Sequence, residues 1–182
     1  MTDPRLPPTA ALTTARLVLE PLRVEHATEL AAVLDDPRLH EFTGGEPPTL
    51  DELTARYERQ VTGRSTDGTQ QWFNWVLRRR DDDRPAGYVQ ASVSSDDDAA
   101  PVAELAWVVG TAHQGQGLAR EGGRAMADWL TAQGVRRLVA HVHPDHVASA
   151  AVARSLGLAA TDELVDGEVR WTTSVQAPGG TR

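Results

Sequence analysis

The stretch GTAHQGQGLA, residues 110–119, places Gly115 and Gly117 between two segments of regular pattern. The residues before it, Val102–Val109, form an apolar run that is typical of a β-strand. The residues after it, 117–133, have the spacing of a helix that is apolar on one side. Glycine is favoured where a backbone turns sharply or comes close to another group. We therefore expect this loop to decide what the chain can bind.

Three glycine-rich patterns can be compared with the loop. A Walker-type phosphate loop needs Gly-Lys-Ser/Thr, and the chain contains no lysine. A dinucleotide fingerprint needs a third glycine at the position that Arg120 occupies. The pattern Gln/Arg-x-x-Gly-x-Gly/Ala does fit. It covers Gln114, Gly115, Gln116, Gly117, Leu118 and Ala119.

This third pattern predicts a cradle for a pyrophosphate. Successive backbone N–H groups turn toward one point where the strand ends, and the N-terminus of the following helix adds its dipole. Small residues at 117 and 119 let the phosphates come close, and no basic side chain is needed. An ordinary turn between a strand and a helix is the alternative. Gly122 and Gly123 inside the helix indicate that it packs tightly on a sheet, since each costs about 1 kcal/mol relative to alanine.

Strands and helices alternate irregularly along the rest of the chain. Strand-like segments are 16–23, 71–79, 88–94, 102–109, 135–143 and 164–175, and helix-like segments are 25–36, 49–57, 117–133 and 145–156. The early strands look linked by hairpins, and those that flank the long helix look parallel, joined by a β-α-β crossover. We expect an α/β (α+β) fold, with a central mixed, mostly antiparallel sheet flanked by helices. A single domain spans 16–175, between an N-terminal arm (1–15) and a flexible tail (176–182).

The composition narrows the classes of function. The chain has 182 residues and a net charge of −8, so a general nucleic-acid surface is not expected. It has no apolar run near the ~20 residues that a membrane helix needs, and no secretory signal. It has no cysteine, which excludes disulfides, thiolate metal sites and a thiol nucleophile. We expect a cytoplasmic protein.

Over roughly residues 16–175, the chain resembles the GNAT superfamily of N-acetyltransferases, most closely the RimJ/RimL type. The resemblance is carried by TARLVLEPLR, by AELAWVV (103–109), by HQGQGLAREG (113–122) and by HPDHVASAAVARSLGL (143–158). It implies acetyl-CoA as cosubstrate, an amine acceptor and a homodimer. It also implies a parallel strand pair, 102–109 and 135–143, that splays apart to form the acetyl-CoA cleft.

The resemblance assigns roles to individual residues. Pantetheine would bind the backbone at Trp107, Val108 and Val109, and the pyrophosphate would bind the amides of residues 114–119. His146 stands where the family often has an asparagine that contacts pantetheine. Leu158 and Ala153 replace a frequent aromatic residue and a tyrosine general acid. RimL-like members have a serine instead, which Ser149 matches.

Acetyl transfer to an amine requires a neutral amine, a polarised carbonyl and a protonated leaving thiolate. Glu104 is the candidate base because it shares a strand face with the small residues Ala106 and Val108; otherwise it is an exposed strand residue. Ser149 is the candidate acid or thiol contact, or else a helix serine that bonds its own backbone. A backbone N–H near Val109 would polarise the carbonyl.

Other polar and aromatic clusters have simpler interpretations. His141, His143 and His146 lack carboxylates or thiols nearby in sequence that would complete a metal site, so we predict none. At least two of Trp72, Phe73 and Trp75 should belong to the core. Arg124 is expected to face phosphates or solvent, or to pair with Asp128.

The loop 40–48 is expected to cover the acceptor site, and the sequence leaves the acceptor itself open. A protein N-terminus and a small amine both fit, and a polycationic amine would suit the acidic chain. A non-catalytic acyl-CoA-binding module is a further alternative.

Overall fold

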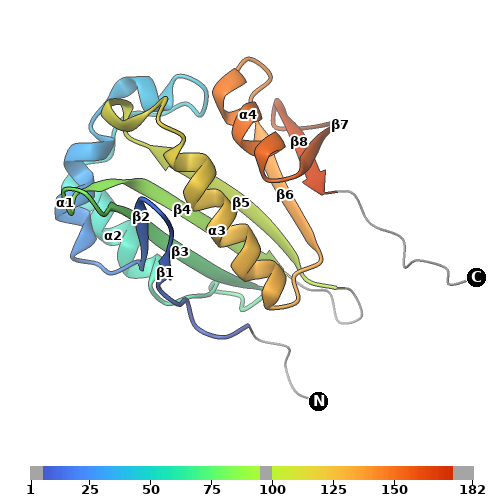
Figure 1. Ribbon diagram of the computed structural model, residues 1–182, viewed down its shortest axis with the longest axis horizontal. Coiled ribbons are helices and arrows are strands. Elements are labelled where there is room, and N and C mark those ends of the chain that lie inside the picture. Colours follow the sequence, from blue (N-terminus) through green and yellow to red (C-terminus); the bar gives the residue numbers. More distant parts are fainter. Residues whose placement is uncertain (1–5, 95–99, 174–182) are drawn as a thin grey trace, which may run out of the picture.

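The computed structural model describes residues 6–94 and 100–173, which contain one eight-stranded sheet, four α-helices and two short 3-10 helices (Figure 1). The strands are β1 (Leu12–Thr13), β2 (Leu17–Pro21), β3 (Gln70–Arg79), β4 (Pro85–Ser94), β5 (Val102–Val109), β6 (Arg137–Val142), β7 (Leu158–Val165) and β8 (Glu168–Thr173). The helices are α1 (His26–Leu34), η1 (Pro37–His40), α2 (Leu50–Gln60), η2 (Thr111–His113), α3 (Leu118–Ala132) and α4 (Val147–Ser155).

The sheet order is β1-β2-β3-β4-β5-β6-β8-β7, and every neighbouring pair is antiparallel except β5 and β6. The helix α3 connects the parallel pair, as the crossover predicts. The expected fold class is therefore confirmed.

Helices cover both faces of the sheet and create two hydrophobic clusters. On one face α3 packs on the central strands, and its Met126 and Leu130 are fully buried with Trp75 (Figure 1). On the other face α1 and α2 bury Leu30 and Leu53 in the second cluster. Since alternate residues of a strand face opposite sides, β5 sends Leu105 and Trp107 to the first cluster.

Several local signals gave correct boundaries. The helix expected from residue 49 does begin there, because Thr49 is the N-cap of α2 and forms a capping box with Glu52 in which both reciprocal hydrogen bonds are present. Asp166 and Gly167 both have positive φ and form the turn between β7 and β8. Phe73 and Trp75 lie in the core, as expected for two of the three aromatic residues.

Three local expectations were wrong or incomplete. The helix expected from residue 145 begins later, because His146 is the N-cap of α4 and its ring accepts the Ser149 N–H. The strand β7 begins at Leu158, earlier than the pattern indicated. Arg124 donates to the Ser155 carbonyl oxygen, which joins α3 to α4, instead of pairing with Asp128.

The N-terminal segment contributes to the sheet. Leu12 and Thr13 pair with β2, and the Ala10 carbonyl oxygen accepts the Trp75 indole N–H at 2.7 Å. The expected tail 176–182 lies outside the described residues. Within 6–94 and 100–173, no helix is long and apolar enough to cross a membrane.

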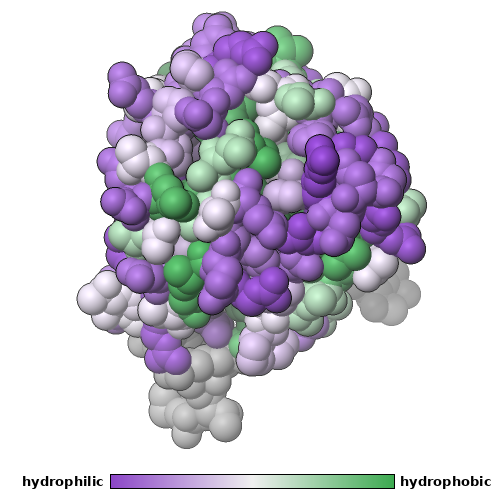
Figure 2. All heavy atoms as spheres, turned by 90° about the vertical axis from the view of Figure 1, so that its left-hand side faces the viewer, coloured by the Kyte–Doolittle hydropathy of each residue, from purple (hydrophilic) through white to green (hydrophobic). Residues whose placement is uncertain are grey.

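The surface on the side of α1 is mostly hydrophilic. Figure 2 shows hydrophobic side chains there only as small separate groups. Nothing on this face forms a broad apolar patch.

Candidate functional site

The β5–β6 pair separates partway along its length. β5 is paired with β4 as far as Gly87↔Val109, whereas its parallel ladder with β6 ends at Glu104↔Val139. Beyond this point β6 stays paired with β8, through Val142↔Val169. The edge of β5 from Leu105 to Val109 therefore has no β6 partner, and its free backbone groups can pair with a ligand.

The glycine loop lies at the end of this free edge. Gly117 is the N-cap of α3 and adopts a left-handed conformation, with φ of 77°. The first hydrogen bond of this helix turn joins the Glu121 N–H to the Gly117 carbonyl oxygen at 3.0 Å. The amides of residues 118–120 precede it and have no partner within the helix, so they can bind an anion.

A basic side chain lies beside the loop, although the glycine pattern needs none. The Arg16 guanidinium donates to the Gln116 carbonyl oxygen at 2.8 Å. Its Nη2 is 3.6 Å from the position that a Cβ on Gly117 would occupy. Arg16 is distant in sequence, so no local pattern could have indicated this contact.

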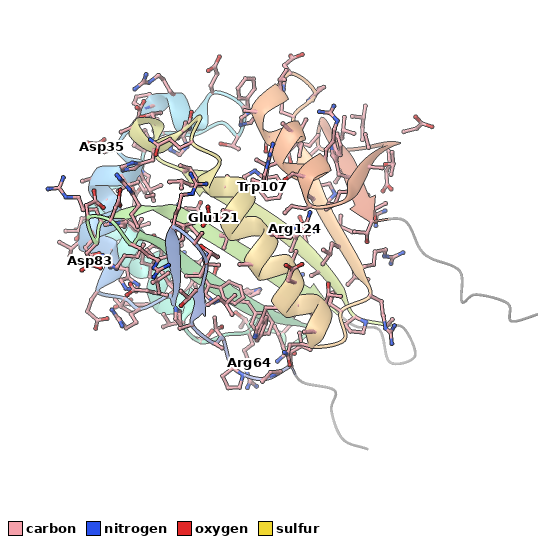
Figure 3. The ribbon with its side chains drawn as sticks, viewed as in Figure 1. Asp35, Arg64, Asp83, Trp107, Glu121 and Arg124 are labelled. Atoms are coloured by element: carbon pink, nitrogen blue, oxygen red, sulfur yellow. The ribbon has the colours of Figure 1, made fainter. Side chains whose placement is uncertain are left out.

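Glu121 holds Arg16 in place. Its carboxylate accepts hydrogen bonds from the Thr14 hydroxyl at 2.6 Å, the Arg16 N–H at 2.8 Å and the Arg16 Nε at 2.7 Å. Burial opposes ionisation, but these bonds outweigh it, and the pKa of Glu121 lies below its ordinary value. The β1–β2 turn is thereby fixed to the first turn of α3 (Figure 3).

The two glycines inside α3 allow the helix to lie close to its neighbours. A Cβ on Gly122 would lie 2.5 Å from Leu77 Cδ2 of β3, and one on Gly123 would lie 3.3 Å from Leu156 Cδ1. Close packing against β3 fixes the height of the loop amides above the sheet.

The structure brings Trp107 and Ser149 together. The indole Nε1–H of Trp107 donates to the Ser149 hydroxyl oxygen at 3.0 Å, from β5 to α4. At the end of β5, the Gln114 carboxamide donates to the Val109 carbonyl oxygen at 3.0 Å. These residues meet where the two strands separate, and their catalytic and binding roles stay predictions.

His146 and the loop 40–48 meet at the start of α4. The Phe42 ring stacks on His146 with centroids 4.4 Å apart, and lies 5.4 Å from the His143 ring. Burial, and secondarily the nearby His143, lower the pKa of His146. The loop thus spans from α1 and η1 to α4.

Glu104 lies on the face opposite α3 and has a partner that the sequence did not indicate. His141 Nδ1 is 3.0 Å from Glu104 Oε1, and the Glu104 side chain is 56% exposed. A neutral imidazole that carries its proton on Nδ1 would donate to the carboxylate. The histidines are therefore divided, since His141 pairs with Glu104 while His143 and His146 contact Phe42. Among residues 6–94 and 100–173, no group of three or more side chains could hold a metal ion.

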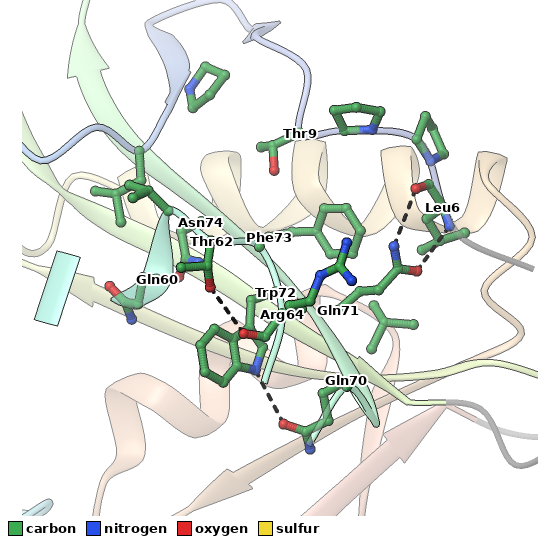
Figure 4. A pocket seen from close by; sticks show the side chains of 18 of the residues that line it. Leu6, Thr9, Gln60, Thr62, Arg64, Gln70, Gln71, Trp72, Phe73 and Asn74 are labelled. Atoms are coloured by element: carbon green, nitrogen blue, oxygen red, sulfur yellow. Dashed lines mark hydrogen bonds between the residues drawn. The ribbon is translucent and has the colours of Figure 1, made fainter. Parts of the chain in front are cut away.

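A cavity of about 570 Å³ lies elsewhere. It is enclosed by the segment that starts at Leu6, by Arg64 in the α2–β3 loop, and by the beginning of β3 at Gln70 and Trp72 (Figure 4). Pro101, just before β5, also lines it. The glycine loop follows the opposite end of β5, and no predicted site residue lines this cavity.

Comparisons with known proteins agree with this geometry. RimL, the ribosomal L7/L12 α-N-protein acetyltransferase solved with coenzyme A, aligns with a TM-score of 0.73 at 17% identity, over 93% of this chain and 100% of that one. The microcin C7 self-immunity acetyltransferase MccE, solved with acetyl-CoA and AMP, aligns with a TM-score of 0.71 at 16% identity, over 94% and 99%. An acetyltransferase from Agrobacterium tumefaciens aligns with a TM-score of 0.69 at 21% identity, over 96% and 99%.

These identities establish the fold alone, and no curated protein was found to match the chain. The family assignment rests on the sequence itself. Residues 16–159 match the family model described as the acetyltransferase (GNAT) domain, which spans the free edge of β5, the glycine loop and α4. The chain belongs to the GNAT acetyltransferase family.

Proposed function

We propose that the chain is an acetyl-CoA-dependent N-acetyltransferase that transfers the acetyl group directly to a primary amine in a ternary complex. The observation that carries the proposal is the position of Glu104. It is the last β5 residue of the β5–β6 ladder, so its exposed carboxylate lies where the free edge begins. A base at this point is next to any thioester that binds along the edge.

Groups of this chain are suited to bind both the pyrophosphate and the pantetheine of acetyl-CoA. The amides of the glycine loop, with Arg16 beside them, would hold the pyrophosphate. The free backbone of Trp107, Val108 and Val109 would pair with pantetheine, and a Val109 N–H would polarise the thioester carbonyl.

In the transfer, the amine nitrogen attacks the thioester carbonyl carbon and the C–S bond breaks. The products are an N-acetyl amide and the free thiol of coenzyme A. Glu104 takes the proton that the amine loses, and His141 orients the carboxylate. Ser149 accepts its hydrogen bond from Trp107, so its own O–H proton is available to the leaving thiolate.

We expect the acceptor to be the α-amine of a peptide or protein N-terminus. An α-amine, with a pKa near 8, is neutral roughly a tenth of the time at pH 7, whereas a lysine amine is neutral about once in a thousand. A weak, exposed carboxylate base suits the first case. A small amine is the alternative acceptor, and a non-catalytic acyl-CoA-binding module is the alternative class. We expect the enzyme to act in the cytoplasm.

Calorimetric titration with acetyl-CoA tests the cosubstrate site. We expect micromolar binding, about −8 kcal/mol, and its loss in Gly117→Glu, which places a carboxylate among the loop amides. Gly68→Glu is the matched control, because Gly68 has a similar φ of 74° and lies in the α2–β3 loop. Equal binding by both variants would mean that the loop is only a turn.

Release of the coenzyme A thiol tests the chemistry, and the absence of cysteine leaves the product as the sole thiol. With an amine acceptor, Glu104→Gln should lower kcat about 100-fold near neutral pH and less at high pH, where the amine is already neutral. Glu163→Gln is the control, since Glu163 is similarly exposed on β7. Full turnover by Glu104→Gln at low pH would remove the proposed role.

A further inference from the structure

A second pocket, of about 170 Å³, lies between α2 and the face of the sheet that carries Glu104. Its polar lining consists of side chains from α2, β3 and β4, namely Arg56, Tyr57, Gln60, Asn74, Tyr88 and Gln90. None of the lining residues is acidic. We call it the Arg56 pocket.

Arg56 has no ion-pair partner among the residues that the structure describes. Its neighbour one turn earlier on α2 is Glu52, which could pair with it at the i, i+4 spacing. The Glu52 carboxylate instead accepts the Thr49 N–H at 2.8 Å and the Thr49 hydroxyl at 2.9 Å in the capping box. These bonds and, to a smaller extent, the nearby Arg56 charge hold the pKa of Glu52 below its ordinary value. The guanidinium thus has an acidic neighbour but no ion pair with it, and it lines the pocket.

The remaining polar groups of the pocket can also donate hydrogen bonds. Tyr57 is 3% exposed, and its hydroxyl is the one buried side-chain polar atom without a hydrogen-bond partner in the described part of the chain. Burial raises the pKa of the Tyr57 and Tyr88 hydroxyls, so both stay protonated at neutral pH. Gln60 Nε2 donates a long hydrogen bond to Gln90 Oε1, at 3.5 Å, which leaves the Gln90 amide donors and the second Gln60 proton for other partners.

The sheet register connects this pocket to Glu104. Asn74 lies opposite Gln90, and Gln90 lies opposite Ala106 of β5, two residues from Glu104 on the same face. Diagonal neighbours of this kind are roughly 7–8 Å apart. From β5 to β3 is two strand spacings, about 10 Å. Two extended peptide residues cover about 7 Å of this distance, and the side chains at either end cover the rest.

We propose that the Arg56 pocket binds a carboxylate of the acceptor, so that the substrate is an amine that also carries an acidic group one or two residues away. A peptide N-terminus with Asp or Glu at its first or second residue has this form, and so does a dipeptide with a free C-terminal carboxylate. This inference rests on the proposed function and names its substrate class. A polycationic amine is disfavoured, because the pocket offers a guanidinium and no carboxylate.

The test compares two hexapeptides with amidated C-termini that differ only in Glu or Gln at the second residue. For the wild type we expect kcat/KM to be about tenfold or more higher for the Glu peptide, as for one charge-assisted contact that is partly exposed. Arg56→Gln should reduce this ratio to about one, and Arg56→Lys should keep part of it. Arg59→Gln is the control, since Arg59 is on the same helix but does not line the pocket. Comparing a dipeptide with a free C-terminus and the same dipeptide with an amidated C-terminus tests whether the pocket also binds a C-terminal carboxylate.

Two further measurements separate this proposal from the proposed function. Arg56→Gln should bind acetyl-CoA with the wild-type affinity in calorimetry, because the pocket lies away from the glycine loop. If no amine is acetylated, the transferase assignment fails, and saturation-transfer NMR of the same two peptides still tests the pocket. Equal binding of both peptides, or a preference for Glu that survives in Arg56→Gln, would overturn the proposal. A stronger preference for a polyamine would overturn it as well.

Discussion

Replacing each glycine of the pair inside α3 by alanine tests how closely this helix must approach the sheet. Both substitutions gain the same helix propensity, about 1 kcal/mol. Their neighbours differ, because the new Cβ of Gly122→Ala would lie 2.5 Å from Leu77 Cδ2, whereas that of Gly123→Ala would lie 3.3 Å from Leu156 Cδ1. Leu77 is fully buried, so it cannot move aside into solvent.

The magnitudes follow from these distances. Overpacking a buried site costs about 1–3 kcal/mol, which exceeds the propensity gain at Gly122 and leaves a net loss of roughly 0–2 kcal/mol. At Gly123 a shift of a few tenths of an ångström suffices, so the change should lie between zero and a gain of about 1 kcal/mol. Since propensity cancels between the two variants, their difference measures the extra packing cost at Gly122, about 1.5 kcal/mol at the middle of these ranges.

Urea denaturation followed by tryptophan fluorescence gives both free energies of unfolding. The midpoint should be lower for Gly122→Ala than for Gly123→Ala, with the same m-value. In thermal unfolding the same difference corresponds to roughly 3–6 °C in Tm for a chain of this size. Equal midpoints, or a lower midpoint for Gly123→Ala, would refute the argument that α3 is held down on Leu77.

Three further predictions concern stability. Glu121→Ala removes the carboxylate that anchors Arg16 and should lower the free energy of unfolding by about 2–3 kcal/mol, after allowance for the exposure of Arg16; an unchanged urea midpoint would contradict this. Burial lowers the pKa of His26, so the unfolded chain takes up a proton near pH 6.5 before the folded chain does. Stability should therefore be complete above that pH and fall below it, and His26→Gln should flatten the dependence between pH 7 and 5. Thr49→Ala should cost about 1 kcal/mol through loss of the N-cap, and Thr54→Ala on the same helix less, as thermal denaturation can measure.

Local sequence signals identified the framework of the site. The glycine pattern located the turn into α3, where Gly117 has the positive φ that favours glycine. The helical pattern from residue 49 marked the start of α2, and the crossover around the long helix predicted the parallel pair. Each of these features depends on residues close together in the sequence, so periodicity and turn chemistry could reveal them.

Such local signals could not predict contacts between segments that are distant in the sequence. Arg16 reaches the carbonyl of Gln116 and Glu104 pairs with His141 because the sheet brings their strands or turns together. The capping of α4 by His146 depends on its φ of −82° and ψ of 72°, which no propensity scale specifies. The sequence therefore predicted the backbone framework of the site, but it did not predict which side chains contact one another there.

The acceptor chemistry shows why local charge outweighs net charge. The formal charge of −8 favours cationic substrates, but it is a sum over the whole chain. At physiological ionic strength, charges farther than about 8 Å from a ligand are largely screened. The lining of the Arg56 pocket offers one guanidinium, several neutral donors and no carboxylate, and the Glu52 carboxylate one turn away is bonded to Thr49. The lining of the pocket, rather than the composition of the chain, therefore decides the sign of the group that binds there.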